Sequence, residues 1–304
     1  MHPALFYRGI DDYLAGVGGF VRNGLAAGEP VFVSVPPERL APLRAFLGVD
    51  ADRVVLHDMS EVGRNPGRIL TALTDFAARR GAGRAWLVGE PIWPSRSPLE
   101  IREATRHEAL INLAFADVPV TILCPYDVSG LDPHTVADAW RTHPVVWADG
   151  AEMPSTEYAD PYAVSTDCDA LPAEEPAKAV RMSLGPGELA LVRMRAVEFG
   201  RASGLPPERL ADLKLAVGEA AANTLRHGGG AGKVTMWRTP TEVIVEVRDG
   251  GRLADPLSGR LRPPLGAVGG RGLWLIHQVC DLVELGSGLL RLHMRITARA
   301  EPAP

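Results

Sequence analysis

The sequence predicts two domains of different class, an α/β N-terminal domain built on a parallel sheet and an α+β two-layer sandwich at the C-terminus. Up to about residue 150, short apolar runs alternate with longer helical patterns. After residue 178, helical patterns come first and strand-like runs follow them. The stretch between the two is rich in acidic residues and proline. These three observations define the predicted fold class.

The N-terminal strands are predicted from runs of β-forming residues. Each run is continuously apolar, which is typical of strands buried on both faces of a sheet. Roughly 15 to 30 residues separate successive runs, enough for a crossover helix between parallel strands. The predicted strands are residues 30–36, 53–59, 85–90 and 118–125.

A linker is predicted where the composition changes. Thr142 to Ala177 contains eight acidic residues and no Lys or Arg, mixed with prolines. Such a composition disfavours a packed core and favours loop structure. We therefore expect domains at residues 1–150 and 179–300, joined by an acidic, proline-containing linker at 151–178.

The C-terminal elements are predicted from periodicity. One helix carries Leu191, Met194 and Val197, and a second begins at Pro207. The apolar stripe of the second helix has helical spacing and consists of Leu210, Leu213, Val217, Ala220 and Thr224. Strands at 233–239 and 242–249, a Gly/Pro-rich loop, a short helix and a strand at 290–296 complete a mixed sheet with helices on one face.

The composition is that of a globular protein, with 46% hydrophobic and 23% charged residues. The chain has no apolar run of membrane-spanning length and no signal-peptide pattern at its start, so we expect a cytoplasmic protein without membrane contact. Cys124, Cys168 and Cys280 form no CxxC pair, which disfavours a disulfide framework and a zinc knuckle. We expect reduced, structural cysteines.

The two halves differ in charge. Met1 to Ala177 carries 25 acidic and 14 basic residues, and Lys178 to Pro304 carries 12 acidic and 18 basic residues. The arginines of the basic half are scattered and no aromatic-rich basic face accompanies them. An acidic ligand such as a nucleotide is therefore favoured over direct nucleic-acid binding.

One glycine run, HGGGAGKV from His227 to Val234, superficially resembles a phosphate-binding loop. The Walker-A pattern requires glycine where His227 stands and Ser or Thr where Val234 stands. The run is better interpreted as the turn between the second helix and the strand that begins at Lys233.

Three features further along point to chemistry. Glu219 and Asn223 are four residues apart, so they share a helix face, and their oxygens are ligands that suit Mg²⁺. Asp249 ends a strand and is followed by Gly250 and Gly251. The run 269–272, Gly-Gly-Arg-Gly, opens a helix whose first amides are a potential anion site. Each feature alone is also typical of a solvated helix face or an ordinary turn.

In this order, EAAANTLRHG, DGG and GGRGLWLI resemble the N box and the two glycine boxes of the GHKL (Bergerat-type, HATPase_c) ATPases, and among them the anti-sigma-factor serine kinases. The resemblance covers roughly residues 180–297 and implies ATP and Mg²⁺ as cofactors. It implies that Asn223 ligates Mg²⁺ and that Glu219 is the general base, the catalytic residue. The implied nucleotide contacts are Asp249 to the adenine amino group, Gly251 beside the base, and Gly270 and Gly272 near the phosphates.

The resemblance also implies partners: a sigma factor that is sequestered, and a STAS-type anti-anti-sigma protein that is phosphorylated on serine, in a bacterial stress response. A homodimer is a further possibility. One departure from the family pattern is the short segment GSGLLRLHM. The family commonly has Gly-Thr or a similar polar pair before its final strand, and here only Ser287 stands near that place. The departure is expected to affect the phosphate end of the nucleotide pocket. It motivates an alternative, a catalytically silent adaptor. A sensor histidine kinase, the third alternative, needs an acceptor histidine on a long helix, and 142–186 offers only His143.

The N-terminal half resembles the MEDS sensory domain of methanogen and methylotroph regulators through HPALFYRG, GEPIWPSRSPLEIREATRHEALIN and ILCPYD. This implies sensing of a small molecule or partner. In open parallel sheets, ligands bind beyond the carboxyl ends of strands, so the candidate pocket residues are Glu90, Trp93, Cys124 and Tyr126. The alternatives are ordinary helix ion pairs with a buried cysteine, or a metal site of His2, His107 and Cys124, which no short ligand spacing supports.

Overall fold

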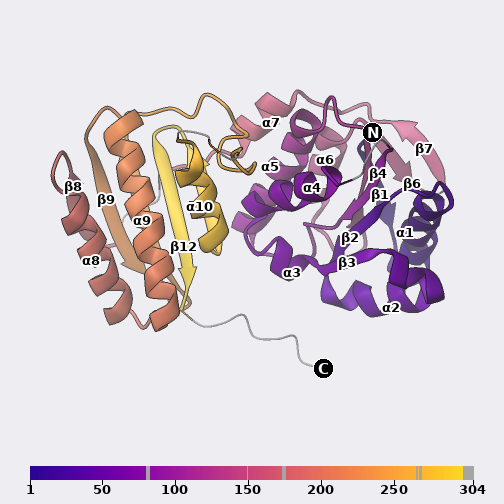
Figure 1. The fold of residues 1–304 in the computed structure, drawn as a ribbon, viewed down its shortest axis with the longest axis horizontal. Helices are drawn as coiled ribbons and strands as arrows, with labels where there is room; N and C mark the ends of the chain where they lie inside the picture. The colour runs from indigo at the N-terminus through magenta and orange to yellow at the C-terminus, as the bar shows by residue number, and fades with distance from the viewer. Residues whose placement is uncertain (80–82, 149, 173–175, 265, 267–268, 297–304) are drawn as a thin grey trace. The chain divides into compact units, whose positions relative to one another are not determined.

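The computed structural model divides the chain into two compact units, Met1–Cys168 and Asp169–Pro304. It describes every residue except 80–82, 149, 173–175, 265, 267–268 and 297–304 (Figure 1). Each unit has its own sheet and its own core, and each is described by itself.

The N-terminal unit is an α/β domain with a seven-stranded sheet (Figure 1). Its strands, in spatial order, are β3 (Val55–Asp58), β2 (Val31–Val35), β4 (Ala85–Gly89), β5 (Val120–Asp127), β1 (Pro3–Tyr7), β6 (Val145–Ala148) and β7 (Ala151–Pro154). All neighbouring pairs are parallel except β6 with β7, which is antiparallel. The predicted α/β class is confirmed, and the sheet also contains β1, β6 and β7, which periodicity did not predict.

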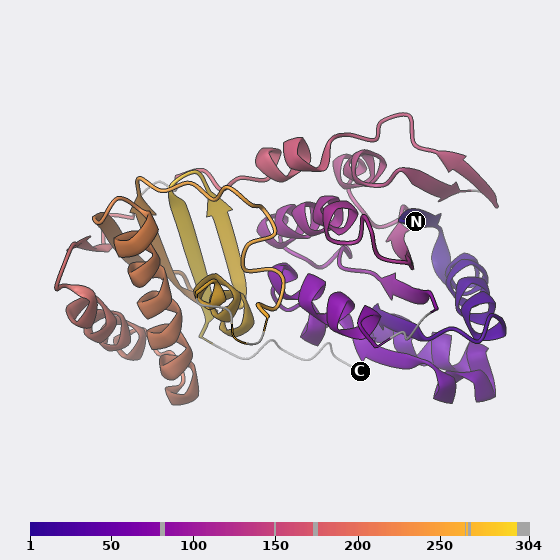
Figure 2. The same ribbon diagram turned by 45° about the horizontal axis from the view of Figure 1, so that its top comes forward.

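The segment interpreted as a linker is partly regular structure, which corrects the sequence prediction. Residues 151–154 form edge strand β7, and α7 (Pro161–Asp167) follows (Figure 2). The acidic side chains have structural partners: Asp160 caps α7 by accepting from the Tyr162 amide, and Asp167 pairs with Arg141. Two of the acidic residues of this segment, Asp160 and Asp167, therefore have a capping or ion-pairing role in the N-terminal unit.

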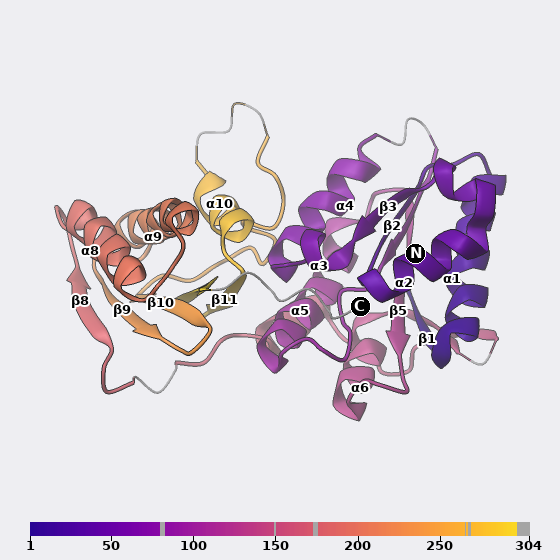
Figure 3. The same ribbon diagram turned by 90° about the horizontal axis from the view of Figure 1, so that it is seen from below.

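Helices cover both faces of the N-terminal sheet. α1 (Gly9–Ala26) and α2 (Pro37–Leu47) lie on one side, and α4 (Ile69–Ala77), α5 (Pro98–Ala114) and α6 (Pro133–Thr142) on the other (Figure 3). One-turn α3 (Met59–Val62) and the 3₁₀ turns η1 (Gly48–Arg53) and η2 (Pro66–Arg68) complete the unit. α5 begins at a capping box of Ser97 and Glu100, and this helix carries many buried polar side chains.

The C-terminal unit is a two-layer α+β sandwich, as predicted. Its sheet runs β11 (Leu282–Gly286), β12 (Leu289–Arg295), β10 (Glu242–Asp249), β9 (Gly232–Arg238) and β8 (Val180–Leu184). Every neighbouring pair is antiparallel, which corrects the expectation of a mixed sheet. The helices α8 (Leu189–Ala202), α9 (Pro207–His227) and α10 (Arg271–Val279) cover one face (Figures 1 and 3).

The helix faces were predicted correctly for α9 and wrongly for α8. In α9, Leu213, Val217, Ala220 and Thr224 are buried and Leu210 packs against the same core. In α8 the buried side is Val192, Ala196 and Gly200, whereas Leu191 and Met194 are 42% and 48% exposed. A Cβ at Gly200 would lie 2.7 Å from Leu213, so α8 meets α9 through small residues. A helix face predicted from its large apolar side chains does not include a contact of this kind, which is made by small residues. In the part of the chain that the structure describes, no helix has the length and apolarity to cross a bilayer.

Candidate functional site

A pocket opens at one end of the C-terminal sheet, where the end of α9, the end of β10 and the β11–β12 turn meet. Its apolar lining includes Ala220, Val247, Leu253, Leu273 and Leu289, and its polar lining includes Asn223, Thr224, His227, Asp249 and Arg252. A mostly apolar wall with a few polar groups is typical of small-molecule sites. Its volume of about 130 Å³ is below the roughly 300–1,000 Å³ of whole-ligand pockets. As it stands, the pocket has room for part of a ligand the size of a nucleotide.

Asp249 is the anchored carboxylate of this pocket. Its Oδ2 accepts a hydrogen bond from the Thr224 hydroxyl at 2.6 Å, and its Oδ1 accepts from the Gly251 amide at 2.8 Å. A carboxylate has about four acceptor positions, so these two bonds orient Asp249 and leave other acceptor positions free. Asp249 can therefore accept hydrogen bonds from a ligand while its side chain stays fixed.

Glycines allow the chain to close around Asp249. A Cβ at Gly228 would lie 2.3 Å from Asp249 Oδ2, and one at Gly251 would lie 3.0 Å from Oδ1. Gly288 has a φ of +65°, and a Cβ there would lie 2.5 Å from the Asp249 carbonyl oxygen. Gly251 thus makes room for the carboxylate itself, besides any room it leaves for a ligand.

Glu219 and Asn223 meet the start of α10. A Cβ at Gly272 would lie 2.7 Å from Glu219 Oε2 and 3.4 Å from Asn223 Oδ1, so a larger residue at this position would displace the Glu219 carboxylate. Gly269 and Gly270 precede the helix with φ of +92° and +77°, a left-handed turn that favours glycine. The first amides of α10 therefore lie beside two oxygen-bearing side chains, which suits a cation and an anion held together.

The short loop noted in the sequence is a two-residue hairpin turn, Ser287–Gly288, between β11 and β12. The Asp249 amide donates to the Gly288 carbonyl at 3.0 Å. The departure from the family pattern therefore lies beside Asp249, and not at the start of α10 where the phosphates were expected. The expectation that it affects the phosphate end is corrected accordingly.

In the N-terminal unit, Glu90 lies just beyond the carboxyl end of β4, fully buried. The Tyr7 hydroxyl donates to Glu90 Oε1 at 2.7 Å. Among the described residues, Glu90 Oε2 and the Tyr13 hydroxyl have no hydrogen-bond partner. Burial raises the pKa of Glu90 to about 8. Arg39 lies over the rings of Tyr7 and Tyr13, which makes this a polar group enclosed by aromatic side chains.

A second buried polar cluster of this unit surrounds Cys124. Cys124 Sγ lies 3.3 Å from His2 Nε2, and Glu108 Oε2 lies 3.2 Å from the same nitrogen. His143 Nε2 lies 3.3 Å from Glu108 Oε2. Burial is the main cause that lowers the pKa of His2 to about 4, so its imidazole is neutral near pH 7.

Two protein-family models match separate stretches of the chain. Residues 1–144 match MEDS, the methanogen/methylotroph, DcmR sensory domain. Residues 182–296 match the histidine kinase-like ATPase domain. The chain joins a MEDS domain to a histidine kinase-like ATPase domain. The resemblances to the MEDS domain and to the GHKL (HATPase_c) ATPases are thereby confirmed, and the second family implies that this domain binds ATP. No curated protein matches the chain.

In the ATPase domain, the structure brings together the residues that the motifs singled out. Glu219, Asn223 and Gly272 lie in one group, and Asp249 and Gly251 in another that adjoins it through Thr224. Gly270 is the N-cap residue immediately before α10. Thr224 was assigned to the buried stripe alone, and its hydrogen bond to Asp249 is a contact that periodicity does not reveal.

In the MEDS domain, the four candidates do not form one group. Glu90 contacts Tyr7, and Cys124 contacts His2. The Trp93 indole donates to Ser95 at 2.8 Å and carries the Arg96 guanidinium 4.0 Å above its ring. The ring of Tyr126 lies 5.6 Å from that of His143.

The metal site that the sequence suggested is also corrected. His2 and Cys124 do meet, but the other members of their cluster are Glu108 and His143, and His107 is not among them in the described residues. Adjacent helical residues point about 100° apart, so His107 and Glu108 lie on different faces of α5. His2 precedes β1, Tyr7 is the last residue of β1 and His143 precedes β6. Periodicity did not predict these two strands, so the positions of the three residues could not be inferred.

Proposed function

We propose that the ATPase domain is an ATP- and Mg²⁺-dependent protein serine kinase of the anti-sigma type, regulated by the MEDS domain. Its substrate would be a serine of a STAS-type anti-anti-sigma protein, and its second partner a sigma factor that it sequesters. The observation that carries this proposal is the contact of Glu219 and Asn223 with Gly272 at the start of α10.

The residues present fit a nucleotide and its metal. Because Gly272 has no Cβ, the first amides of α10 can lie close to the Asn223 amide oxygen. The amides would hold phosphate, and the Asn223 oxygen would hold Mg²⁺. Asp249 would accept a hydrogen bond from the exocyclic amino group of adenine, because the bonds from Thr224 and Gly251 leave acceptor positions on its carboxylate free. When bound, ATP supplies the phosphoryl group and Mg²⁺ neutralises its charge.

Glu219 is suited to act as the general base. Among the described residues it makes no hydrogen bond or ion pair, and it is half-buried next to Asn223. It also lines a depression between α8 and α9 with Arg193, Lys214 and Leu215. A carboxylate between the nucleotide side and an open side can accept the proton of a serine hydroxyl that arrives from a partner.

The test combines binding and transfer. Calorimetric titration of the full chain with ATP–Mg²⁺ should show one site per chain. Pull-down of partners with and without ATP–Mg²⁺, followed by phosphosite mapping, should find a phosphoserine on a captured protein. Phosphorylation of a histidine, or capture that ignores the nucleotide, would contradict the serine-kinase proposal.

A catalytically silent adaptor is the second candidate, and the two-residue Ser287–Gly288 turn favours it because this turn contacts Asp249 in place of a longer polar loop. Tight binding of a partner without ATP affinity would support the adaptor. The histidine-kinase alternative has less support, because α7, of seven residues, is the only helix in the described part of 142–186.

A further inference from the structure

Four chemically distinct side chains of the MEDS domain converge in its interior. His2 precedes β1, Glu108 is on α5, Cys124 is in the middle of β5 and His143 follows α6. All four are buried, and one ligand-type atom from each lies within 4.8 Å of the others. Positions so far apart in the chain are brought together only by the fold.

Three of the six separations between the ligand atoms are close to those around a four-coordinate metal ion, and all six lie within 4.8 Å. Bonds of 2.0–2.3 Å in a tetrahedral zinc site place neighbouring ligand atoms roughly 3.3–3.8 Å apart. Here the separations are 3.2 Å from His2 Nε2 to Glu108 Oε2 and 3.3 Å from His2 Nε2 to Cys124 Sγ. The separation from His143 Nε2 to Glu108 Oε2 is also 3.3 Å.

The hydrogen-bond partner of His2 Nδ1 shows which ring nitrogen of His2 carries the hydrogen. His2 Nδ1 lies 3.1 Å from Asn112 Oδ1. The Asn112 amide nitrogen donates to the Thr142 carbonyl at 2.8 Å, so the side of Asn112 that faces His2 is its oxygen. That oxygen only accepts, and therefore Nδ1 of His2 is the N–H donor. In the neutral ring, Nε2 then points its lone pair at the centre of the cluster.

His143 has the same arrangement. Its Nδ1 lies 2.9 Å from the Ala139 carbonyl oxygen, which only accepts, so this nitrogen also carries hydrogen. Nε2 of His143 faces the cluster and has no hydrogen-bond partner among the described residues. A bond from the outer ring nitrogen to an oxygen is the usual support of a metal-binding histidine.

These assignments leave too many acceptors at the centre. Two imidazole lone pairs and a carboxylate oxygen converge there, and with Glu108 ionised and both imidazoles neutral, the Cys124 thiol carries the only hydrogen among the four facing ligand atoms. Glu108 Oε1 also lacks a hydrogen-bond partner among the described residues. A divalent ion would satisfy the acceptors, and its two charges would balance one thiolate and one carboxylate in a buried site.

We propose that His2, Glu108, Cys124 and His143 form a four-coordinate binding site for Zn²⁺ or a divalent transition metal of the same class. A thiolate with two imidazoles disfavours Mg²⁺ and Ca²⁺, which prefer oxygen ligands. With all four positions filled by protein, the site is of the closed, structural type. The metal ties the residue before β1 to α5, β5 and the end of α6, and so links three layers of the domain.

The test uses the full chain with a cleavable C-terminal tag that contains no histidine. Metal analysis of the purified protein should find about one zinc-class ion per chain. After chelation, Co²⁺ should restore the site and give visible bands of tetrahedral cobalt with a thiolate charge-transfer band. Cys124→Ser should abolish that band, whereas Cys168→Ser, at another buried cysteine of this domain, should keep it.

The supporting residue gives a finer test. Asn112→Ala should weaken Co²⁺ affinity about 10- to 100-fold, because His2 loses the oxygen that orients it. His134→Gln, on an exposed turn of α6, should leave the affinity unchanged. Folded wild-type protein that takes up neither Zn²⁺ nor Co²⁺ would overturn the proposal, as would a cobalt spectrum without a thiolate band. In either case the cluster is a hydrogen-bonded core.

Discussion

The pocket of the ATPase domain takes its polar side chains from short motifs, whereas the Cys124 cluster of the MEDS domain takes one side chain from each of four distant positions. Glu219 and Asn223 are one helical turn apart, and Asp249 is next to its own glycines. His2 and His143, by contrast, are separated by almost the whole domain and have ring centroids 4.1 Å apart. Local spacing positions the first site, and strand order positions the second.

This difference matters for how each site responds to change. In the ATPase domain, glycines let the motif residues approach one another closely, so a methyl group added at Gly272 would displace the Glu219 carboxylate. In the MEDS domain, the polar groups lie in a packed interior, so their protonation is coupled to folding. We therefore expect substitutions in the ATPase motifs to act on catalysis and ligand binding, and substitutions in the interior of the MEDS domain to act on the pH dependence of stability.

The largest effect is expected at Glu219. Glu219→Gln should lower the rate of phosphoryl transfer to the partner by about 10²- to 10⁴-fold, because the amide cannot accept the serine proton. ATP affinity should change little, since the side chain is not in the lining of the pocket around Asp249. Single-turnover transfer measures the first quantity and calorimetry the second. Glu208→Gln, exposed on the same helix, is the matched control. A transfer rate within a few-fold of wild type would exclude Glu219 as the base.

Glu90 should make the stability of the MEDS domain depend on pH. The pKa of Glu90 is about 8 when folded, against an ordinary value of 4.5, so the folded state keeps a proton that the unfolded state has lost. Stability is therefore full below pH 4.5 and falls as the pH rises toward 8. The loss is of the order of 3–5 kcal/mol.

Urea denaturation at several pH values measures this dependence. Glu90→Gln cannot ionise and should flatten the profile, and Glu61→Gln, at an exposed position, should not. If wild type and Glu90→Gln lose stability in parallel as the pH rises, Glu90 is already ionised in the folded domain.

A smaller effect is expected from the proposed contact of Asp249 with the adenine base. Asp249→Asn replaces one acceptor oxygen with a donor and should weaken ATP binding by about 1–3 kcal/mol, roughly 5- to 150-fold. Inosine triphosphate lacks the exocyclic amino group of ATP, so wild type should prefer ATP and the variant should lose most of that preference. Competition binding with the two nucleotides measures the ratio. An unchanged ratio would mean that Asp249 only orders the Thr224 and Gly251 contacts.

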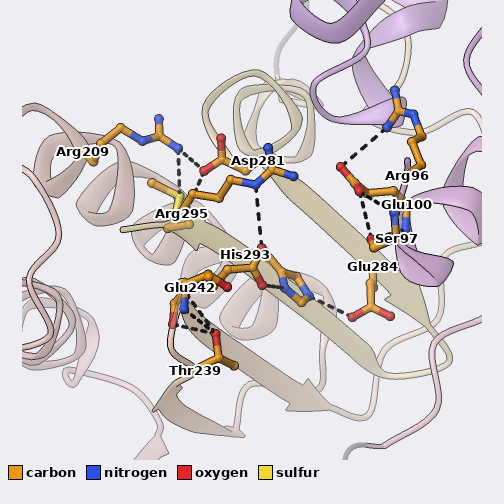
Figure 4. A network of polar contacts seen from close by, with 12 residues as sticks. Arg96, Ser97, Glu100, Arg209, Thr239, Glu242, Asp281, Glu284, His293 and Arg295 are labelled. Atoms are coloured by element: carbon orange, nitrogen blue, oxygen red, sulfur yellow. Dashed lines mark hydrogen bonds and ion pairs between the residues drawn. The ribbon is translucent and has the colours of Figure 1, made fainter. Parts of the chain in front are cut away.

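The smallest effect concerns the sheet face that the helices do not cover. His293 on β12 contacts Glu242 at 3.0 Å and Glu284 at 2.9 Å (Figure 4). Burial alone would lower the pKa of His293, but the two carboxylates outweigh it and raise the pKa. This contribution to stability is present below the ordinary value of 6.5 and is lost as the pH rises through the folded pKa.

Glu242→Gln should reduce that contribution and destabilise the ATPase domain by about 1 kcal/mol at pH 6, because Glu242 is partly exposed. The pKa of His293 should fall, which NMR titration of its ring protons measures. A pKa that stays where it is in this variant would assign the shift to Glu284 alone.

The sequence by itself determined the domain classes and the ATPase constellation. Continuous apolar runs predicted β2, β3, β4 and β5, and the i,i+4 pair on α9 with two glycine motifs predicted which side chains would meet. These inferences succeeded because helical spacing and glycine turns are properties of a few neighbouring residues.

Only the tertiary structure decided the rest. Periodicity did not predict β1, β6 and β7, and the position of β1 between β5 and β6 is what brings His2, Cys124 and His143 together. The face of α8 was likewise decided by the close approach of Leu213 to Gly200, not by the large residues of the helix. The Tyr7 and Tyr13 surroundings of Glu90 follow from strand pairing and helix packing. Contacts between distant segments depend on sheet order, which no local pattern encodes.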